Sequence, residues 1–122
     1  MEEITFDMAK QALLDAIALR GEDYVYKKPE GESSCLYVHT DDEGVKSAGC
    51  GVGLALSLLG LPLTVIEGHN RLGWSTLHRA LGIKVDSGAD MLFGHFQWMQ
   101  DSGRPWGYSY QAALRYAATF TE

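Results

Sequence analysis

The chain of 122 residues is poor in cysteine, proline and basic side chains. Two cysteines are too few for the disulfide framework of a small secreted scaffold, and they are not spaced as a Cys-x-x-Cys metal motif. Ten Lys plus Arg against 16 Asp plus Glu give a net charge of -6, which excludes a polybasic nucleic-acid arm. A hydrophobic content of 46% excludes collagen and a disordered tail. We therefore expect one globular domain over residues 1–122.

Signals for secretion and membrane insertion are also missing. No basic region followed by an apolar run stands at the start, so a secretory signal is not expected. Residues 47–66 are uncharged over about the length of a membrane span, but four glycines and Pro62 interrupt them. Gly60 followed by Pro62 is typical of a helix end, so this stretch is interpreted as a buried helix. These observations predict a cytoplasmic protein without a membrane span.

Apolar periodicity predicts about five helices. Thr5 is the expected N-cap of the first helix, which Gly21 ends. Ser47 is the expected cap of a second helix that is apolar on all sides and therefore buried. Ser87, with Asp90 three residues on, is the expected cap of a later helix. The predicted helical ranges are 6–20, 48–59, 74–81, 88–101 and 106–120, and residues 62–72 have room for one further helical turn.

Short strands are predicted between the first two helices. Cys35–His39 alternates, with Leu36 and Val38 expected to face the core. An acidic turn at 41–44 leads to a short return strand at 45–46, and 24–26 has the pattern of a third strand. The predicted fold class is α+β, mostly α, with a small antiparallel two- or three-stranded element in the N-terminal third. Because so small a sheet is not stable alone, it must pack on the helices.

Glycines give two further expectations about packing. Gly49, Gly53 and Ser57 are spaced by four, so one face of the second helix is smooth and lets another backbone approach closely. Leu59-Gly60-Leu61 and Leu81-Gly82-Ile83 each place a glycine at a helix end and an apolar residue after it. That order is typical of a helix stop in which the chain folds back on the last turn.

Cys50 is the strongest candidate for chemistry. With Ser47 as the cap, its thiol would occupy the third helical position, where the helix dipole favours a thiolate. Residues 49–63 resemble the nucleophile helix of NlpC/P60-type cysteine peptidases, with Gly94-His95-Phe96 in place of the strand that bears the base. The resemblance implies a cysteine hydrolase that uses Cys50 with His95 or His39. The alternative is that Cys50 is a small buried side chain of the core.

Metal, phosphate and DNA sites have less support. A metal site would need Cys35, His39 and Cys50 with one of His69, His78 or His95. The spacing of these residues does not favour such a site, so no metal or cofactor is expected. The glycines at 49, 51 and 53 lack the spacing of a dinucleotide-binding loop. A helix-turn-helix over 54–71 would place an apolar segment, 63–69, in the DNA groove. Nucleic acid is therefore an unlikely partner, although a DNA-binding regulator is kept as an alternative.

The first third of the chain combines acidic side chains with tyrosines. Residues 1–45 carry 11 acidic and 4 basic side chains, whereas residues 46–122 carry 5 and 6. A solvated face is the ordinary explanation. The functional alternative is a docking face for a basic partner, because tyrosine among charges is typical of interfaces. The residues predicted to bind a partner are Tyr24, Tyr26, Tyr37, Asp41, Asp42 and Glu43.

Four segments together resemble an uncharacterised family of short proteins from actinobacteriophages and their hosts. These segments are 20–26, 35–39, the Cys50-x-x-Gly53 motif with its Leu-Gly stop, and 100–107. The resemblance implies a phage-related protein in a bacterial cytoplasm and no catalytic residue. We therefore expect a non-enzymatic interaction protein that binds a protein partner through the strand region or an exposed aromatic surface. Three tryptophans at 74, 98 and 106 indicate either a dense core or self-association as a homodimer.

Overall fold

The computed structural model describes residues 3–28, 36–70 and 72–121, with side chains up to Thr119. These residues form a mostly helical α+β fold with a two-stranded antiparallel sheet in the N-terminal half, which confirms the predicted fold class. The described residues form six helices. Five correspond to the predicted helices, and the additional one is a short helix within the segment 62–72. In chain order the elements are β1 (Glu3–Ile4), α1 (Phe6–Arg20), β2 (Val38–Thr40), β3 (Lys46–Ala48), α2 (Gly51–Leu58), α3 (Leu63–Glu67), α4 (Trp74–Ala80), β4 (Lys84–Val85), α5 (Ser87–Asp101) and α6 (Trp106–Thr121).

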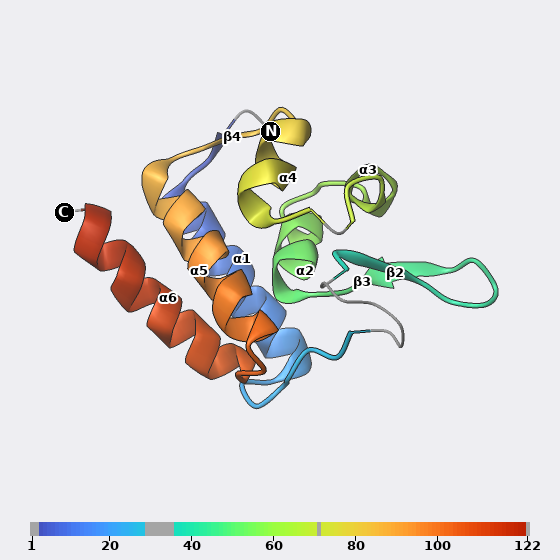
Figure 1. The fold of residues 1–122 in the computed structure, drawn as a ribbon, viewed down its shortest axis with the longest axis horizontal. Helices are drawn as coiled ribbons and strands as arrows, with labels where there is room; N and C mark the ends of the chain where they lie inside the picture. The colour runs from blue at the N-terminus through green and yellow to red at the C-terminus, as the bar shows by residue number, and fades with distance from the viewer. Residues whose placement is uncertain (1–2, 29–35, 71, 122) are drawn as a thin grey trace.

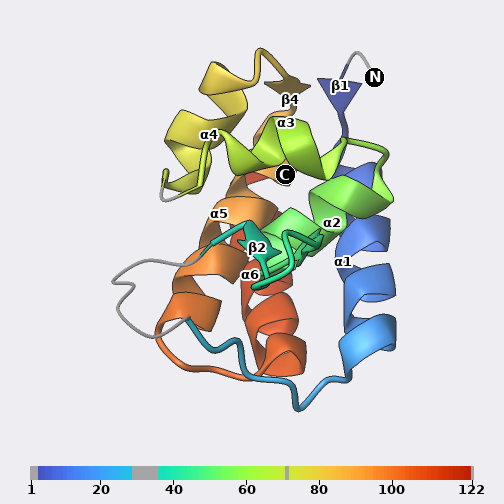
Figure 2. The same cartoon turned by 90° about the vertical axis from the view of Figure 1, so that its right-hand side faces the viewer.

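Three long helices, α1, α5 and α6, lie side by side, and α2 packs against α1 and α5 (Figure 1). The hairpin of β2 and β3 projects from the body on the side away from α6 (Figure 1). The shorter helices α3 and α4 lie toward one end, which Figure 2 shows at the top. Helix α4 lies beside β4, whereas α3 lies beside the hairpin of β2 and β3 (Figure 1). The main core fills the space between the long helices and α2, and it includes Leu13, Leu56, Phe93 and Trp106.

The N-termini of α1 and α5 share one capping side chain. Thr5 Oγ1 accepts from Met8 N at 3.2 Å, which confirms the predicted cap of α1. The cap of α5 is Asp86, one residue before the predicted Ser87. Asp86 Oδ1 accepts from Ala89 N at 2.8 Å, and Oδ2 accepts from Phe6 N at 2.9 Å. Aspartate takes the capping role because its two oxygens satisfy orphan donors of two helices, whereas a serine has one.

Helix α2 begins at Gly51, and its N-cap is Cys50. The predicted start at Ala48 with Ser47 as cap is therefore wrong. Residues 46–48 are extended because they pair with β2, with Ser47 opposite His39. The pairing continues to the helix, since Cys50 N donates to the carbonyl of residue 36 at 3.0 Å. Residues 51–56 are all buried, as the all-round apolar pattern predicts, but Leu58 in the last turn is 43% exposed, so the helix is not buried over its whole length.

Glycines let β2 and α2 approach each other closely. A Cβ placed on Gly49 would lie 2.2 Å from the carbonyl oxygen of Leu36. A Cβ on Gly53 would lie 2.2 Å from the carbonyl oxygen of Tyr37. No side chain fits at such distances. The predicted close approach of a backbone to the helix is found at Gly53, whereas Gly49 precedes α2 and does not belong to the predicted helical face.

Two glutamines of α5 bind the N-termini of shorter helices. Gln100 Oε1 accepts from Gly51 N at 2.8 Å and from Trp106 Nε1 at 3.1 Å. Gln97 Oε1 accepts from Trp74 N at 3.1 Å. Both side chains are buried, at 2% and 7% exposed. They supply acceptors where α2 and α4 lack a side-chain cap of their own.

Four of the described helices end at a glycine with positive φ, and α1 ends as predicted at Gly21, with φ 101°. Gly60 has φ 103°, and Leu61 N beyond it donates to Leu56 O at 3.1 Å, five residues back. The same bond follows Gly82, so both predicted helix stops are confirmed. Gly103, at φ 87°, ends α5 in the same way.

The strand predictions are partly right. The turn at 41–44 and the antiparallel hairpin are present, with Asp41 Oδ1 accepting from Val45 N at 2.9 Å. Residues 24–26 form no strand, because this part of the chain caps α6 instead, with Tyr24 O accepting from Trp106 N at 2.8 Å. Val38 faces the core as expected, but Tyr37 on the opposite side is buried too. The pairing of β1 with β4 is parallel and was not predicted.

None of the helices in the described part of the chain has the length and apolar character that a membrane crossing requires.

Candidate functional site

An exposed aromatic surface lies on the outer side of α5 and α6. Trp98 is 63% exposed, the largest exposed fraction among the aromatic side chains that stand out on the described surface. The His95 ring stacks on the Tyr116 ring, with centroids 4.4 Å apart and planes 11° from parallel. His95 also meets Trp98, at 5.5 Å between centroids. We call His95, Trp98 and Tyr116 the aromatic face.

Helix geometry brings this face together. His95 and Trp98 are three residues apart on α5, so they are neighbours on one side of the helix. Tyr116 comes from α6, which packs along α5 (Figure 1). Burial lowers the pKa of His95 below its usual range. At neutral pH the ring is therefore uncharged, which suits a flat stack on the Tyr116 ring.

Beside the aromatic face the surface is hollowed, with a volume of about 410 Å³. Trp74 Nε1 donates to Asp90 Oδ1 at 2.8 Å, and His78 Nε2 lies 3.4 Å from the same oxygen. Asp90 stands in the first turn of α5, where the helix dipole stabilises its negative charge. The hollow is thus aromatic with one acidic group at its edge. Its lining includes Trp74, Asp90, Gly94, His95, Trp98 and Tyr116.

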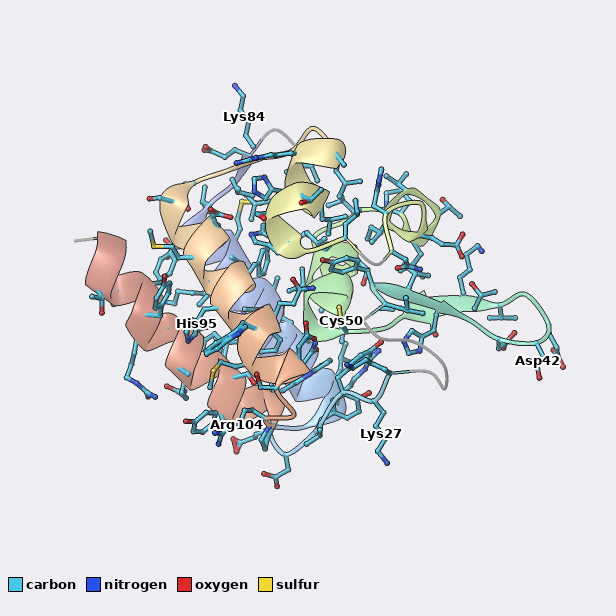
Figure 3. The ribbon with its side chains drawn as sticks, in the orientation of Figure 1. Lys27, Asp42, Cys50, Lys84, His95 and Arg104 are labelled. Carbon is cyan, nitrogen blue, oxygen red and sulfur yellow. The ribbon has the colours of Figure 1, made fainter. Side chains whose placement is uncertain are left out.

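Of the predicted catalytic residues, His95 is separated from Cys50, whereas His39 lies beside Gly49, the residue that precedes Cys50. Cys50 is 0% exposed and sits at the N-cap of α2 rather than at the third helical position. His95 lies on the other side of α5 from Cys50 (Figure 3). His39 packs against Gly49, where an added Cβ would lie 2.6 Å from its Cδ2. The alternative interpretation of Cys50 as a core side chain agrees with this burial.

His39 is engaged by Tyr26. Tyr26 Oη accepts from Leu36 N at 3.0 Å and lies 2.8 Å from His39 Nε2. Burial, and then the positive charge of Arg20, lower the pKa of His39 below its usual range. The neutral ring can therefore accept a hydrogen bond from the Tyr26 hydroxyl group at Nε2. This pair connects the start of β2 to the segment that follows α1.

The candidate metal set of Cys35, His39 and Cys50 stays a prediction, because Cys35 lies outside the described residues. Among the residues that the structure does describe, no three His, Cys, Asp or Glu side chains gather as metal ligands would.

The predicted partner-binding residues divide into two groups. Asp41, Asp42 and Glu43 are exposed at the tip of the hairpin, where the labelled Asp42 points away from the body (Figure 3). Tyr26 and Tyr37 are buried, at 7% and 0% exposed, so the expectation that they lie on the surface is wrong.

These tyrosines are buried because their hydroxyl groups are used inside the protein. Tyr37 Oη donates to Leu72 O at 2.6 Å and accepts from Gln97 Nε2 at 2.9 Å. Tyr24 is half-buried and packs edge-on against Trp106, with ring centroids 4.6 Å apart. The tyrosines therefore belong to the packing of the hairpin and of α6.

The recognition helix of the DNA-binding alternative is also shorter than predicted. Helix α3 covers only Leu63–Glu67, and Gly68 caps it. Glu67 forms an ion pair with Lys46 at 2.7 Å and accepts a hydrogen bond from Thr40 at 2.9 Å. The acidic side chain thus ties α3 to the hairpin.

The aromatic face itself was missed as a set. The sequence pattern places positions 91, 95 and 98 on one stripe of α5, but the expected exposed aromatic surface had no residues assigned to it. Gly94 could have indicated this surface, because a glycine in the middle of a helix lowers its stability and usually has a packing or functional role.

Comparison with known proteins adds no relative: no family model, curated protein or solved structure matches this chain.

Proposed function

We propose that this protein is a non-enzymatic interaction protein of the cytoplasm that binds a protein partner through the aromatic face. The observation that carries the proposal is Trp98, a large ring that is 63% exposed beside a hollow of about 410 Å³. Exposed tryptophan and tyrosine next to a pocket are typical of the residues that dominate binding energy at protein interfaces. The resemblance to actinobacteriophage proteins extends the proposal to a host or phage partner.

The acidic hairpin tip has a supporting role in this proposal. Asp41, Asp42 and Glu43 stand on a projecting hairpin and belong to a chain with a net charge of -6. Charges of this kind speed encounter with a basic partner more than they add to affinity. The same observations give the two alternatives little support, because Cys50 is buried and α3 is five residues long.

The test compares two exposed aromatic residues on different surfaces. Purified wild-type protein, Trp98→Ala and Tyr108→Ala are immobilised and used to capture proteins from an actinobacterial lysate and from a displayed library of random peptides. Tyr108 is a matched control, since it is 47% exposed and stacks with Arg104 on another part of α6. We expect ligands that wild type and Tyr108→Ala retain and that Trp98→Ala loses.

Sedimentation of the same three proteins tests self-association through this face. Binding that is equal for all three proteins, or no binding in either capture format, would contradict the proposal. If the wild type forms a concentration-dependent dimer and Trp98→Ala does not, the partner of the aromatic face is a second copy of this chain and not another protein.

A further inference from the structure

Gly94 lies in the floor of the hollow beside the aromatic face, and packing does not require it. A Cβ built on Gly94 would meet only Trp74 Cδ1, at 3.4 Å, which is ordinary van der Waals contact. The other glycines inside the described helices differ. At 51, 53, 88 and 107 an added Cβ would lie 2.9 Å or less from a neighbouring atom. Gly94 therefore lowers the stability of α5 although no packing contact requires a glycine there. Such locally unfavourable residues are typical of functional sites.

The hollow carries one formal charge at neutral pH among the described residues that line it, and that charge is negative. Asp90 is its acidic residue, no Lys or Arg lines it, and the lowered pKa keeps His95 neutral. Both intramolecular contacts of the Asp90 carboxylate use Oδ1, and the side chain is 46% exposed. Oδ2 can therefore accept a hydrogen bond from a ligand.

Asp90, Gly94 and Trp98 form a row along α5. They are four residues apart, so they lie on one side of the helix over about 12 Å. The middle position has no side chain, so within this row nothing stands between the carboxylate and the indole ring, and Trp74 and Gly94 both line the hollow there. The stacked rings of His95 and Tyr116 border the hollow.

We infer that the hollow binds an arginine side chain of the protein partner. The guanidinium donates to Asp90 Oδ2, and the methylene stem crosses Gly94 and covers the Trp98 ring. Arginine fits better than lysine because its planar, weakly hydrated group stacks on aromatic rings. The net charge of -6 adds long-range attraction for a basic segment. This inference rests on the proposed function, because it identifies what the partner places in the site.

The test uses small probes in place of the partner. The N-acetyl, N-methylamide derivatives of arginine, lysine and citrulline are titrated into the whole protein and followed by NMR of backbone amides and tryptophan indoles. Citrulline has nearly the same shape as arginine but no charge. We expect arginine to shift the signals of Gly94 and the Trp98 indole, and citrulline to bind at least about fivefold more weakly.

Four variants locate the binding. Asp90→Asn keeps an acceptor for Trp74 Nε1 and should lower arginine affinity at least about fivefold, whereas Asp7→Asn removes the same charge from the first turn of α1 and should not. Gly94→Ala should lower affinity without loss of stability, because its methyl group enters the hollow. Tyr108→Ala should bind as wild type does.

The result that overturns the inference is equal binding of arginine and citrulline, tighter binding of lysine, or an arginine affinity that Asp90→Asn leaves unchanged. If this happens while partner capture still depends on Trp98, only the arginine assignment fails. If capture no longer depends on Trp98, the proposed function fails whatever the probes show.

Discussion

Gly53 and Gly94 both interrupt the middle of a helix, where glycine is less favourable than alanine. Around Gly53 the β2 backbone passes so close to α2 that a Cβ would lie 2.2 Å from Tyr37 O. Around Gly94 the nearest atom would be a ring carbon of Trp74 at 3.4 Å. Packing therefore requires the glycine in the interior but does not require the glycine on the outer side of α5.

The difference separates the two regions by what constrains them. Between α2 and β2, backbone contact and buried amides leave almost no choice of side chain. On the outer side of α5, a more stable residue would fit at 94, and a smaller or polar residue in place of Trp98 would expose less apolar surface. We take the outer side as the part of the molecule shaped by binding.

The largest expected effect is that of Gly53→Ala. The added methyl group would strike a backbone carbonyl that cannot rotate away, so strand and helix must separate. We expect a loss of about 3 kcal/mol or more in the free energy of unfolding, the upper end for overpacked cores. Urea unfolding followed by tryptophan fluorescence measures it. A loss below about 1 kcal/mol would show that the interior yields more easily than its contacts indicate.

Replacement of Gln100 tests the polar part of the same interior. In Gln100→Leu, the N–H of Gly51 and the indole N–H of Trp106 both lose their buried acceptor. We expect a loss of about 2–3 kcal/mol, since each unsatisfied donor costs about 1–3 kcal/mol. The control is Gln111→Leu at an exposed position of α6, which should change stability by less than about 0.5 kcal/mol. Equal effects of the two variants would contradict the role given to Gln100.

On the outer side, Gly94→Ala makes the same chemical change as Gly53→Ala. Here alanine is the better helix former, and the nearest neighbour of its methyl group would be Trp74 Cδ1 at 3.4 Å. We expect a gain of about 0.5–1 kcal/mol in the same urea experiment. The free energy of unfolding should thus fall in Gly53→Ala and rise in Gly94→Ala. A clear loss of stability in Gly94→Ala would contradict the distinction between the two regions.

The smallest expected effect is a dependence of stability on pH. The pKa values of His39 and His95 lie below the ordinary value of 6.5 in the folded protein. Below pH 6.5 the unfolded chain therefore binds more protons than the folded one. Their contribution to stability is complete above pH 6.5 and is lost as pH falls through the lowered folded values.

Urea midpoints between about pH 7.5 and about pH 5.5 measure this effect, above the range where most carboxylates titrate. His39→Gln keeps an acceptor for Tyr26, and together with His95→Gln it should flatten the profile. A double variant with the wild-type slope would rule out these two residues as its source.

Much of the fold follows from local patterns. The cap at Thr5, the stops at Gly60 and Gly82 and the burial of 51–56 depend on neighbouring residues, and all were predicted. The start of α2 was not, because pairing with β2 holds 46–48 extended against their own preference. The cap at Asp86 depends on Phe6, 80 residues away.

The candidate site was predicted less well for the same reason. Tyr26 and Tyr37 carry polar groups that suit a surface, and they are interior residues because partners distant in the sequence, among them His39 and Gln97, satisfy their hydroxyl groups. Exposure of Trp98 depends on how α6 lies along α5, which periodicity within one helix does not determine.

The shared cap at Asp86 also bears on the order of folding. Closing an 80-residue loop is entropically costly, and the first turn of α1 gains its partner only when the chain has been made as far as 86. The backbone N–H groups of Phe6 and Ala89 donate to the same carboxylate, so their amide protons should exchange with solvent in one cooperative opening. A residue from the last third of the chain thus completes the capping of α1, and until that residue has been synthesised Thr5 is the cap that is present.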